Sequence, residues 1–256
     1  MRISVSKLLA VICLSTAGPA SFAQPASPTP FQQRVLAAMQ GDMRTPEERA
    51  RDVNRLPAEI LEFFRMREDM RVIEMLPAGG WFTKILAPVL KDKGKLYVTH
   101  PEGFYAEAYR RIAGVPGLAA VEQIGWGASA AGSGGPFGPS GRWDVAPVDM
   151  VVTFRIYHNF SPADRGTVNR STFEALKPGG YYGIVDHTRR HNEPQNSTNR
   201  RRVDPVLIIK EVQAAGFQLV DFSNLYYRSN DALALEVANP EVNDRTDRTA
   251  LLFRKP

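Results

Sequence analysis

Short apolar runs alternate with amphipathic stretches along most of the chain. From residue 71 onward, seven runs rich in β-branched and aromatic residues have the length and composition of strands. They are residues 71–75, 95–99, 120–124, 150–153, 181–185, 217–222 and 249–254. Stretches with apolar residues at helical spacing predict helices between these runs, at residues 81–90, 105–112, 163–176 and 205–215.

This alternation indicates an α/β fold with a doubly wound, mostly parallel sheet that helices cover on both faces. No helix of similar length separates the last two runs, so we expect a C-terminal hairpin that adds an antiparallel strand. Upstream, helices are predicted at residues 31–40, from Thr45 and from Pro57. Thr45 can cap its helix because Pro46 suits the first turn and Glu48 completes a capping box.

The first 23 residues have the plan of a secretory signal peptide. A basic start precedes the apolar run 8–14, and small residues lead to Ala23. The run is shorter than the roughly 20 apolar residues that span a bilayer. We therefore expect residues 1–23 to be a signal peptide, residues 24–44 an N-terminal extension, and residues 45–256 the folded domain of an exported, periplasmic protein. The alternatives are a buried N-terminal helix and an uncleaved anchor.

Composition narrows the class of protein. The chain has 256 residues, of which 43% are hydrophobic and 23% charged, as in folded globular proteins. The net charge of +5 is spread along the sequence, so the expected partner is a small-molecule substrate rather than nucleic acid, and no stable membrane insertion is expected after signal cleavage. The single cysteine, Cys13, lies inside the leader, and a mature chain without thiols suits an oxidising compartment.

Two biased segments allow two interpretations each. The Gly-, Ser- and Pro-rich residues 125–141 are more typical of a flexible insertion than of a phosphate cradle, because no helix start follows to supply amide groups. The arginines at 189–190 and 200–202 are more typical of a solvated face than of a surface that attracts an anionic substrate or lipid headgroups.

Polar side chains gather where the predicted strands end. Glu74 lies in the first strand, ahead of a turn of small residues. All four histidines follow a strand, namely His100, His158, His187 and His191. Because open α/β sheets bind ligands beyond the carboxyl ends of their strands, these residues are the candidates for a site.

Several of these segments resemble class I S-adenosylmethionine-dependent methyltransferases. Residues 71–87 (RVIEMLPAGGWFTKILA) are similar to the first motif of that family, and residues 176–187 (LKPGGYYGIVDH) to its fifth strand and the preceding turn. More narrowly, the chain resembles a group of predicted bacterial methyltransferases that often carry signal peptides. That group has Tyr-His after strand four, Asp-His after strand five and Asp-Arg-Thr-Asp-Arg before the last strand, which here are residues 157–158, 186–187 and 244–248.

The resemblance implies a seven-stranded sheet in the order 3-2-1-4-5-7-6 with the cofactor S-adenosylmethionine over strands one and two. By position, the cofactor-binding residues would be Glu74, Ala78, Gly79, Gly80, His100 and Glu102. Leu76 and Ala78 stand where the family usually has glycines. His100 replaces the carboxylate that usually holds the ribose, and Glu102 could take over that role. Asp149 and Thr153 would lie on strand four.

Methyl transfer to oxygen or nitrogen needs a base, and histidine changes charge near neutral pH. The resemblance places His158 as the first candidate catalytic base and His187 as the second, with Asp186 as the partner that orients a ring. Arg155 and Tyr157 could fix an anionic or aromatic substrate, although surface packing is the slightly favoured interpretation.

The function predicted from the sequence is therefore that of a methyltransferase that uses S-adenosylmethionine on an unidentified acceptor. The alternative is an exported, non-catalytic ligand-binding protein that keeps the fold. A metal-dependent hydrolase that uses residues 158, 186, 187 and 191 is disfavoured, because no paired-histidine helix motif is present and no metal site is expected. A nicotinamide oxidoreductase would need G-x-G-x-x-G after the first strand, where the chain has L-P-A-G-G-W.

Overall fold

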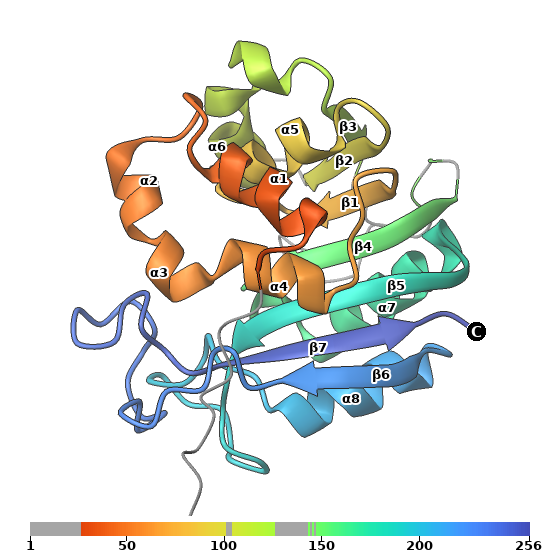
Figure 1. Cartoon of the computed structure of the whole chain (residues 1–256). Helices are drawn as coiled ribbons and strands as arrows, with labels where there is room; N and C mark the ends of the chain where they lie inside the picture. Colours follow the sequence, from red (N-terminus) through yellow and green to blue (C-terminus); the bar gives the residue numbers. More distant parts are fainter. Residues whose placement is uncertain (1–26, 101–103, 126–142, 144, 146) are drawn as a thin grey trace, which may run out of the picture.

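Seven strands form one mixed sheet in the computed structural model, which describes residues 27–100, 104–125, 143, 145 and 147–256 (Figure 1). The strands are β1 (Arg71–Met75), β2 (Lys95–His100), β3 (Glu122–Gly125), β4 (Val148–Phe154), β5 (Leu176–His187), β6 (Gln218–Ser223) and β7 (Arg248–Arg254). Their order is β3-β2-β1-β4-β5-β7-β6, with β1 to β5 parallel and β7 antiparallel to β5 and β6. The predicted fold class and strand order are confirmed. The expected leader at residues 1–23 and the glycine-rich residues 126–141 lie outside the described residues.

Helices cover both faces of the sheet. They are α1 (Pro30–Met39), α2 (Pro46–Ala50), α3 (Asp52–Arg55), α4 (Pro57–Phe63), α5 (Thr83–Leu90), α6 (Phe104–Ala113), α7 (Pro162–Ala175) and α8 (Pro205–Ala214), with short 3₁₀ turns η1 (Pro116–Leu118) and η2 (Tyr157–Asn159). One core joins α1, α4 and α5 to one sheet face, and the other joins α7 and α8 to the opposite face. In β4, Met150 and Val152 enter the first core and Val151 the second, as the alternation of a strand requires. Within the described residues, no helix has the length and apolar character needed to cross a bilayer.

The N-terminal helices form a cap over the end of the sheet where the parallel strands finish. Thr45 caps α2 as the sequence predicts: its hydroxyl accepts from the Glu48 amide at 3.3 Å, and the Glu48 carboxylate accepts from the Thr45 amide at 3.0 Å. Ahead of it, α1 packs against α4 and α5 with Val35 fully buried. As part of this cap, α2 and α3 lie beside the carboxyl end of β1 (Figure 1).

The expected antiparallel pairing of β6 and β7 is confirmed, with a connection much longer than a hairpin turn. The two strands pair antiparallel, but residues 224–247 form a long irregular segment beyond the carboxyl end of β5, next to α3 in Figure 1. A buried ion pair anchors it, since the Arg202 guanidinium meets Asp231 at 2.9 and 3.1 Å. Arg201 pairs with Glu236 in the same segment. The expected solvated face is thus wrong for Arg201 and Arg202, because each has a carboxylate partner and Arg202 is 1% exposed.

The turn between β1 and α5 contains unusual backbone. Leu76 and Ala78 both have φ of 50°, and Gly80 has φ of 69°. A left-handed conformation costs a residue with a Cβ atom roughly 1–2 kcal/mol, and glycine avoids that cost. The turn therefore has the left-handed conformation that favours glycine at two positions where this chain has larger residues.

We predict that Ala78→Gly stabilises the protein. The strain it removes exceeds the roughly 0.5–1 kcal/mol of extra chain entropy that a glycine loses on folding, so the free energy of unfolding in urea should rise by about 0.5–1 kcal/mol. Gly80→Ala should lower it, because a Cβ there takes on the left-handed strain and would lie 2.0 Å from Ile112 Cδ1. Gly79→Ala is the control with no expected cost, since nothing lies within 4 Å of its Cβ position. An unchanged stability for both Ala78→Gly and Gly80→Ala would contradict this account.

Glu74 is a buried acid in the middle of the sheet. The side chain is 3% exposed, and the Thr83 hydroxyl donates to Oε2 at 2.6 Å, which links β1 to the start of α5. Burial raises the pKa of Glu74 to about 7, against a smaller lowering by the Thr83 hydrogen bond. The carboxyl group is therefore close to half protonated at neutral pH, before any ligand binds.

The raised pKa of Glu74 predicts how stability depends on pH. In the unfolded chain the group titrates near 4.5, so ionisation is harder in the native state and stability is lost as the pH rises from about 4.5 through about 7. The full effect is about 3 kcal/mol. In Glu74→Gln this contribution disappears, so the variant should gain stability relative to the wild type between pH 5 and pH 8 in urea unfolding. If the difference in free energy of unfolding between the two proteins stays constant with pH, the raised pKa of Glu74 is refuted.

Candidate functional site

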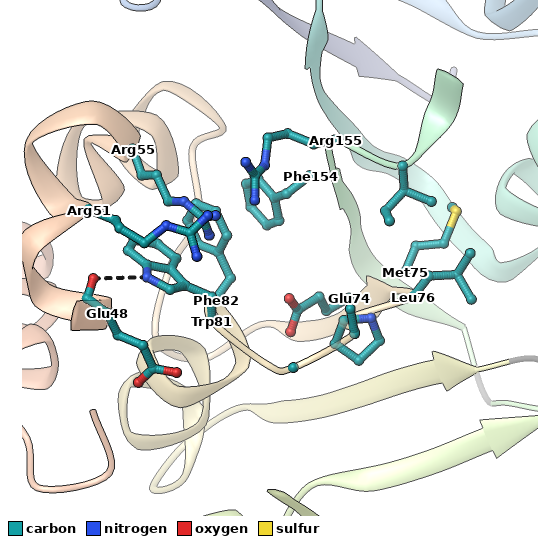
Figure 2. A pocket seen from close by; sticks show the side chains of 14 residues that line it. Glu48, Arg51, Arg55, Glu74, Met75, Leu76, Trp81, Phe82, Phe154 and Arg155 are labelled. Atoms are coloured by element: carbon teal, nitrogen blue, oxygen red, sulfur yellow. Dashed lines mark hydrogen bonds between the residues drawn. The ribbon is translucent and has the colours of Figure 1, made fainter. Parts of the chain in front are cut away.

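Two adjoining clefts open at the carboxyl end of the sheet. The first, with a volume of about 290 Å³, is lined by the β1 turn, the N-terminal cap and the end of β4 (Figure 2). The second, of about 300 Å³, lies over the ends of β4 and β5 against the 224–247 segment. Ala78, Arg155 and Ile156 line both clefts. A ligand in one cleft would therefore meet a ligand in the other at this border.

The first cleft contains half of the predicted cofactor-binding residues. Glu74, Ala78 and Gly79 line it, whereas Gly80 lies under the turn and faces Ile112. His100 ends β2, but its side chain and all of Glu102 lie outside the described residues. These two remain predictions.

Aromatic side chains form another wall of the first cleft. Phe82 and Phe154 stack with their ring planes 11° apart, and Trp81 packs edge-on against Phe82. Trp81 also donates through Nε1 to the Glu48 carbonyl at 3.0 Å, which fixes the cap to the start of α5 (Figure 2). The Arg55 guanidinium lies 4.5 Å from the Trp81 ring centre. None of these aromatic residues was predicted as a site residue, because apolar side chains in such positions are more often core.

The second cleft contains a histidine pair organised by one carboxylate. Asp186 is fully buried at the end of β5 and accepts three hydrogen bonds, from His158 Nδ1 at 2.6 Å, the His158 amide at 2.9 Å and the His187 amide at 2.7 Å. An ionised carboxylate at Nδ1 keeps the proton on that nitrogen. The other ring nitrogen, Nε2, is then the one that can accept a proton in the cleft that His158 lines.

His187 lies beside His158 in a different environment. The two ring centres are 5.6 Å apart, and His187 Nδ1 lies 2.7 Å from the Thr246 hydroxyl. Burial, followed by the charges of His158 and Arg155, lowers the pKa of His187 well below 6.5. His187 therefore stays neutral and is suited to hydrogen bonding rather than to taking up a proton.

A carboxylate from the 224–247 segment completes the site. Arg51 binds Asp244 through Nε and Nη2, both at 2.8 Å, while Arg155 and Arg55 approach its Oδ1 at 3.4 and 3.5 Å. Burial raises the pKa of Asp244, but the Arg51 hydrogen bonds and the charges of all three arginines outweigh that effect and lower it to about 2. Asp244 was not predicted as a site residue, although it lies in the Asp-Arg-Thr-Asp-Arg stretch of the resemblance.

The remaining candidates separate into cleft residues and residues outside the clefts. Arg155 lines both clefts, where it could contact a ligand, and its role as a substrate contact stays a prediction. Tyr157 is fully buried, and its hydroxyl is bonded to Glu211 and Asn169 at 2.9 Å each, so it contacts neither cleft nor surface. His191 is exposed and pairs with Asp204 at 2.9 Å.

Asp149 and Thr153 lie on β4, as the resemblance implies, with Asp149 paired to Lys177 at 2.8 Å. Across the part of the chain that the structure describes, no three His, Cys, Asp or Glu side chains are placed to hold one metal ion.

Comparisons with known proteins extend this picture. No protein-family model matches the sequence, and no curated protein matches it either. Among solved structures, a SAM-dependent methyltransferase from Aquifex aeolicus has a TM-score of 0.57 at 13% identity, over 88% of this chain and 98% of that one. The glycopeptide N-methyltransferase MtfA, in complex with S-adenosylhomocysteine, has a TM-score of 0.54 at 17% identity, over 90% and 99%.

One similar structure shows that this fold does not by itself determine the reaction. The cyclase SpnF has a TM-score of 0.56 at 16% identity, over 88% of this chain and 93% of its own. Proteins with this architecture therefore include both methyltransferases and a cyclase, and the cleft side chains must decide the chemistry. The chain has the fold of the S-adenosylmethionine-dependent methyltransferases.

Proposed function

We propose that this protein is an S-adenosylmethionine-dependent methyltransferase that acts on a small molecule. The cofactor would occupy the first cleft and the acceptor the second. The observation that carries the proposal is the shared border of the two clefts, where the β1 turn opens beside the His158–Asp186 pair. Such an arrangement can hold a methyl donor and a proton acceptor on two sides of one reacting atom.

Three features of the first cleft support cofactor binding there. The space above Gly79 is open, so the backbone there can be approached closely by a ligand. Leu76 lines the cleft but is only 1% exposed, because its side chain packs into the core on the α7 and α8 face. Glu74 offers a carboxyl group to the amino acid part of the cofactor, and Trp81 and Phe82 offer apolar surface.

The residues of the second cleft supply the acid–base chemistry. S-adenosylmethionine, when bound, supplies an electrophilic methyl group on a sulfonium. His158 Nε2 would remove the proton from the acceptor hydroxyl or amine, and the Asp186 carboxylate would stabilise the charged ring that results. Neutral His187 would fix the acceptor by hydrogen bonding. The buried Asp186 also holds the His158 ring in one orientation, so the base is ready before the acceptor arrives.

A second candidate function is a non-catalytic binding protein with the same fold. The left-handed conformations of Leu76 and Ala78 favour it, because side chains have replaced the glycines usual at a cofactor turn. Export would favour it as well, since the cofactor is made in the cytoplasm. We propose that the protein is exported to the periplasm, on the grounds of the leader-like first 23 residues.

Calorimetric titration of the mature chain with S-adenosylhomocysteine tests the cofactor site. We expect micromolar binding that is lost in Gly79→Val, because the added side chain fills the open space above the turn. Glu74→Gln should weaken binding if the carboxyl group contacts the amino acid part of the ligand. Gly166→Ala in α7 is the matched control, and it should bind normally. If the folded wild-type protein does not bind up to millimolar ligand, the non-catalytic function is favoured instead.

Substitution of the proposed base tests the chemistry. With an acceptor found by screening for release of S-adenosylhomocysteine, His158→Gln should lower kcat by about 10²–10⁴-fold, the usual contribution of a positioned base. The Kd for S-adenosylhomocysteine should stay unchanged. Asp186→Asn should also lower kcat, because it removes the charge that stabilises the protonated ring. His191→Gln, at an exposed histidine that already pairs with Asp204, serves as the control. Full activity in His158→Gln would eliminate this residue as the base.

A further inference from the structure

An excess of arginine marks the border between the two clefts. Arg51, Arg55 and Arg155 all line the first cleft, and Arg155 lines the second as well. Figure 2 shows Arg51 and Arg55 entering from the N-terminal cap and Arg155 from the end of β4, all three toward the space above Trp81 and Phe82. Arg248 lies behind them and donates to the Asp244 carbonyl at 2.6 Å.

The acidic groups of the clefts do not balance these charges. The two carboxylate oxygens of Glu48 are already engaged by Lys84 at 2.7 Å and by the Thr45 amide at 3.0 Å. Glu74 is buried and close to half protonated at neutral pH. Asp244 is thus the one carboxylate that contacts the arginines among the described cleft residues, and Arg51 takes its two short hydrogen bonds.

Arg55 and Arg155 are left with weak partners. Each reaches Asp244 only at 3.4–3.5 Å, which is longer than a normal charge-assisted hydrogen bond. Arg55 is 4% exposed, and its Nε has no hydrogen-bond partner. Burial, with the charges of Arg155 and Arg51, lowers the pKa of Arg55 to about 8; burial and Arg248 lower that of Arg155 to about 10. A second anion placed here would relieve both the lost hydration and the repulsion.

We infer that the methyl acceptor is a small molecule with a carboxylate, which Arg155 and Arg55 bind at the border of the clefts. This inference rests on the proposed function. A guanidinium group presents two parallel N–H donors that match the two oxygens of a carboxylate. Because Arg155 also lines the cleft of His158, a molecule anchored there can extend its nucleophilic atom toward Nε2.

Paired titrations of acids and amides test the inference. The probes are hydroxy- and amino-substituted benzoates, each compared with its benzamide, titrated into the full mature protein with and without S-adenosylhomocysteine. We expect benzoates to bind and benzamides not to bind. Arg155→Gln should weaken benzoate binding by roughly 10–100-fold, which corresponds to one or two charge-assisted hydrogen bonds, and should leave the affinity for S-adenosylhomocysteine unchanged. Arg67→Gln, at an exposed arginine outside both clefts, is the control for total charge.

Asp244→Asn gives a result that a purely structural role would not produce. Asn tolerates the left-handed φ of 59° at this position, and the change frees the arginines from their internal carboxylate. Benzoate affinity should therefore rise, whereas Arg51→Gln should lower it by leaving Asp244 to Arg55 and Arg155. Equal binding of benzoates and benzamides, or lower benzoate affinity in Asp244→Asn, would overturn the inference.

The carboxylate of the cofactor is the other possible source of the anion. If Arg155→Gln weakens S-adenosylhomocysteine but not methylthioadenosine, which lacks the amino acid part, the anion belongs to the cofactor and the inference fails. Failure of the proposed function has a different signature. In that case S-adenosylhomocysteine does not bind to the wild-type protein at all, while the arginine site still distinguishes benzoates from benzamides in its absence.

Discussion

The ion-pair cluster around Asp244 holds the functional end of the molecule together. Its carboxylate joins Arg51 at the start of α3 to Arg155 after β4, and it comes from the segment that leads into β7. Arg51 and Asp244 are 193 residues apart in the sequence, so this contact connects the cap to the far half of the sheet. The contact therefore links the cap to the 224–247 segment over the strand ends, where each is also anchored separately, the cap by Trp81 and the segment by the Arg202–Asp231 pair.

The alternation of strands and helices was enough to predict the sheet, because buried parallel strands read as apolar runs that few other structures produce. The predicted β1 matches residue for residue, and the strand order follows from the resemblance. The candidate residues at the strand ends could also be predicted, since the topology alone brings Glu74, His158 and Asp186 to one edge of the sheet. The irregular parts could not be predicted in the same way. The 224–247 segment has no periodicity, and side-chain ion pairs such as Arg202–Asp231 hold it in place.

Burial distinguishes the charged residues that can contact a ligand from those that only stabilise the structure. The arginines at 200–202 looked like a solvated face because charged side chains usually are exposed. Arg202 is instead enclosed with Asp231, and the pair fixes the outer wall of the second cleft. In contrast, Arg155 keeps about a quarter of its side chain accessible, at 26%, with only a long contact to a carboxylate. A single sequence cannot separate these two cases, because the partner of each arginine lies 29 or 89 residues further along the chain.

The two neighbouring histidines show how one carboxylate can assign different roles to the same side chain. Asp186 accepts a hydrogen bond from the ring of His158, whereas from His187 it accepts one from the backbone amide only. His158 therefore gains a stabilising negative charge next to its ring, whereas the ring of His187 faces a hydroxyl and a cluster of arginines. Protonation of His187 is opposed by burial and by nearby positive charge, which lower its pKa. Arg155, which would bind an anionic acceptor, thus also adds to the burial that keeps the second histidine neutral, so one residue contributes to both the binding and the acid–base properties of the clefts.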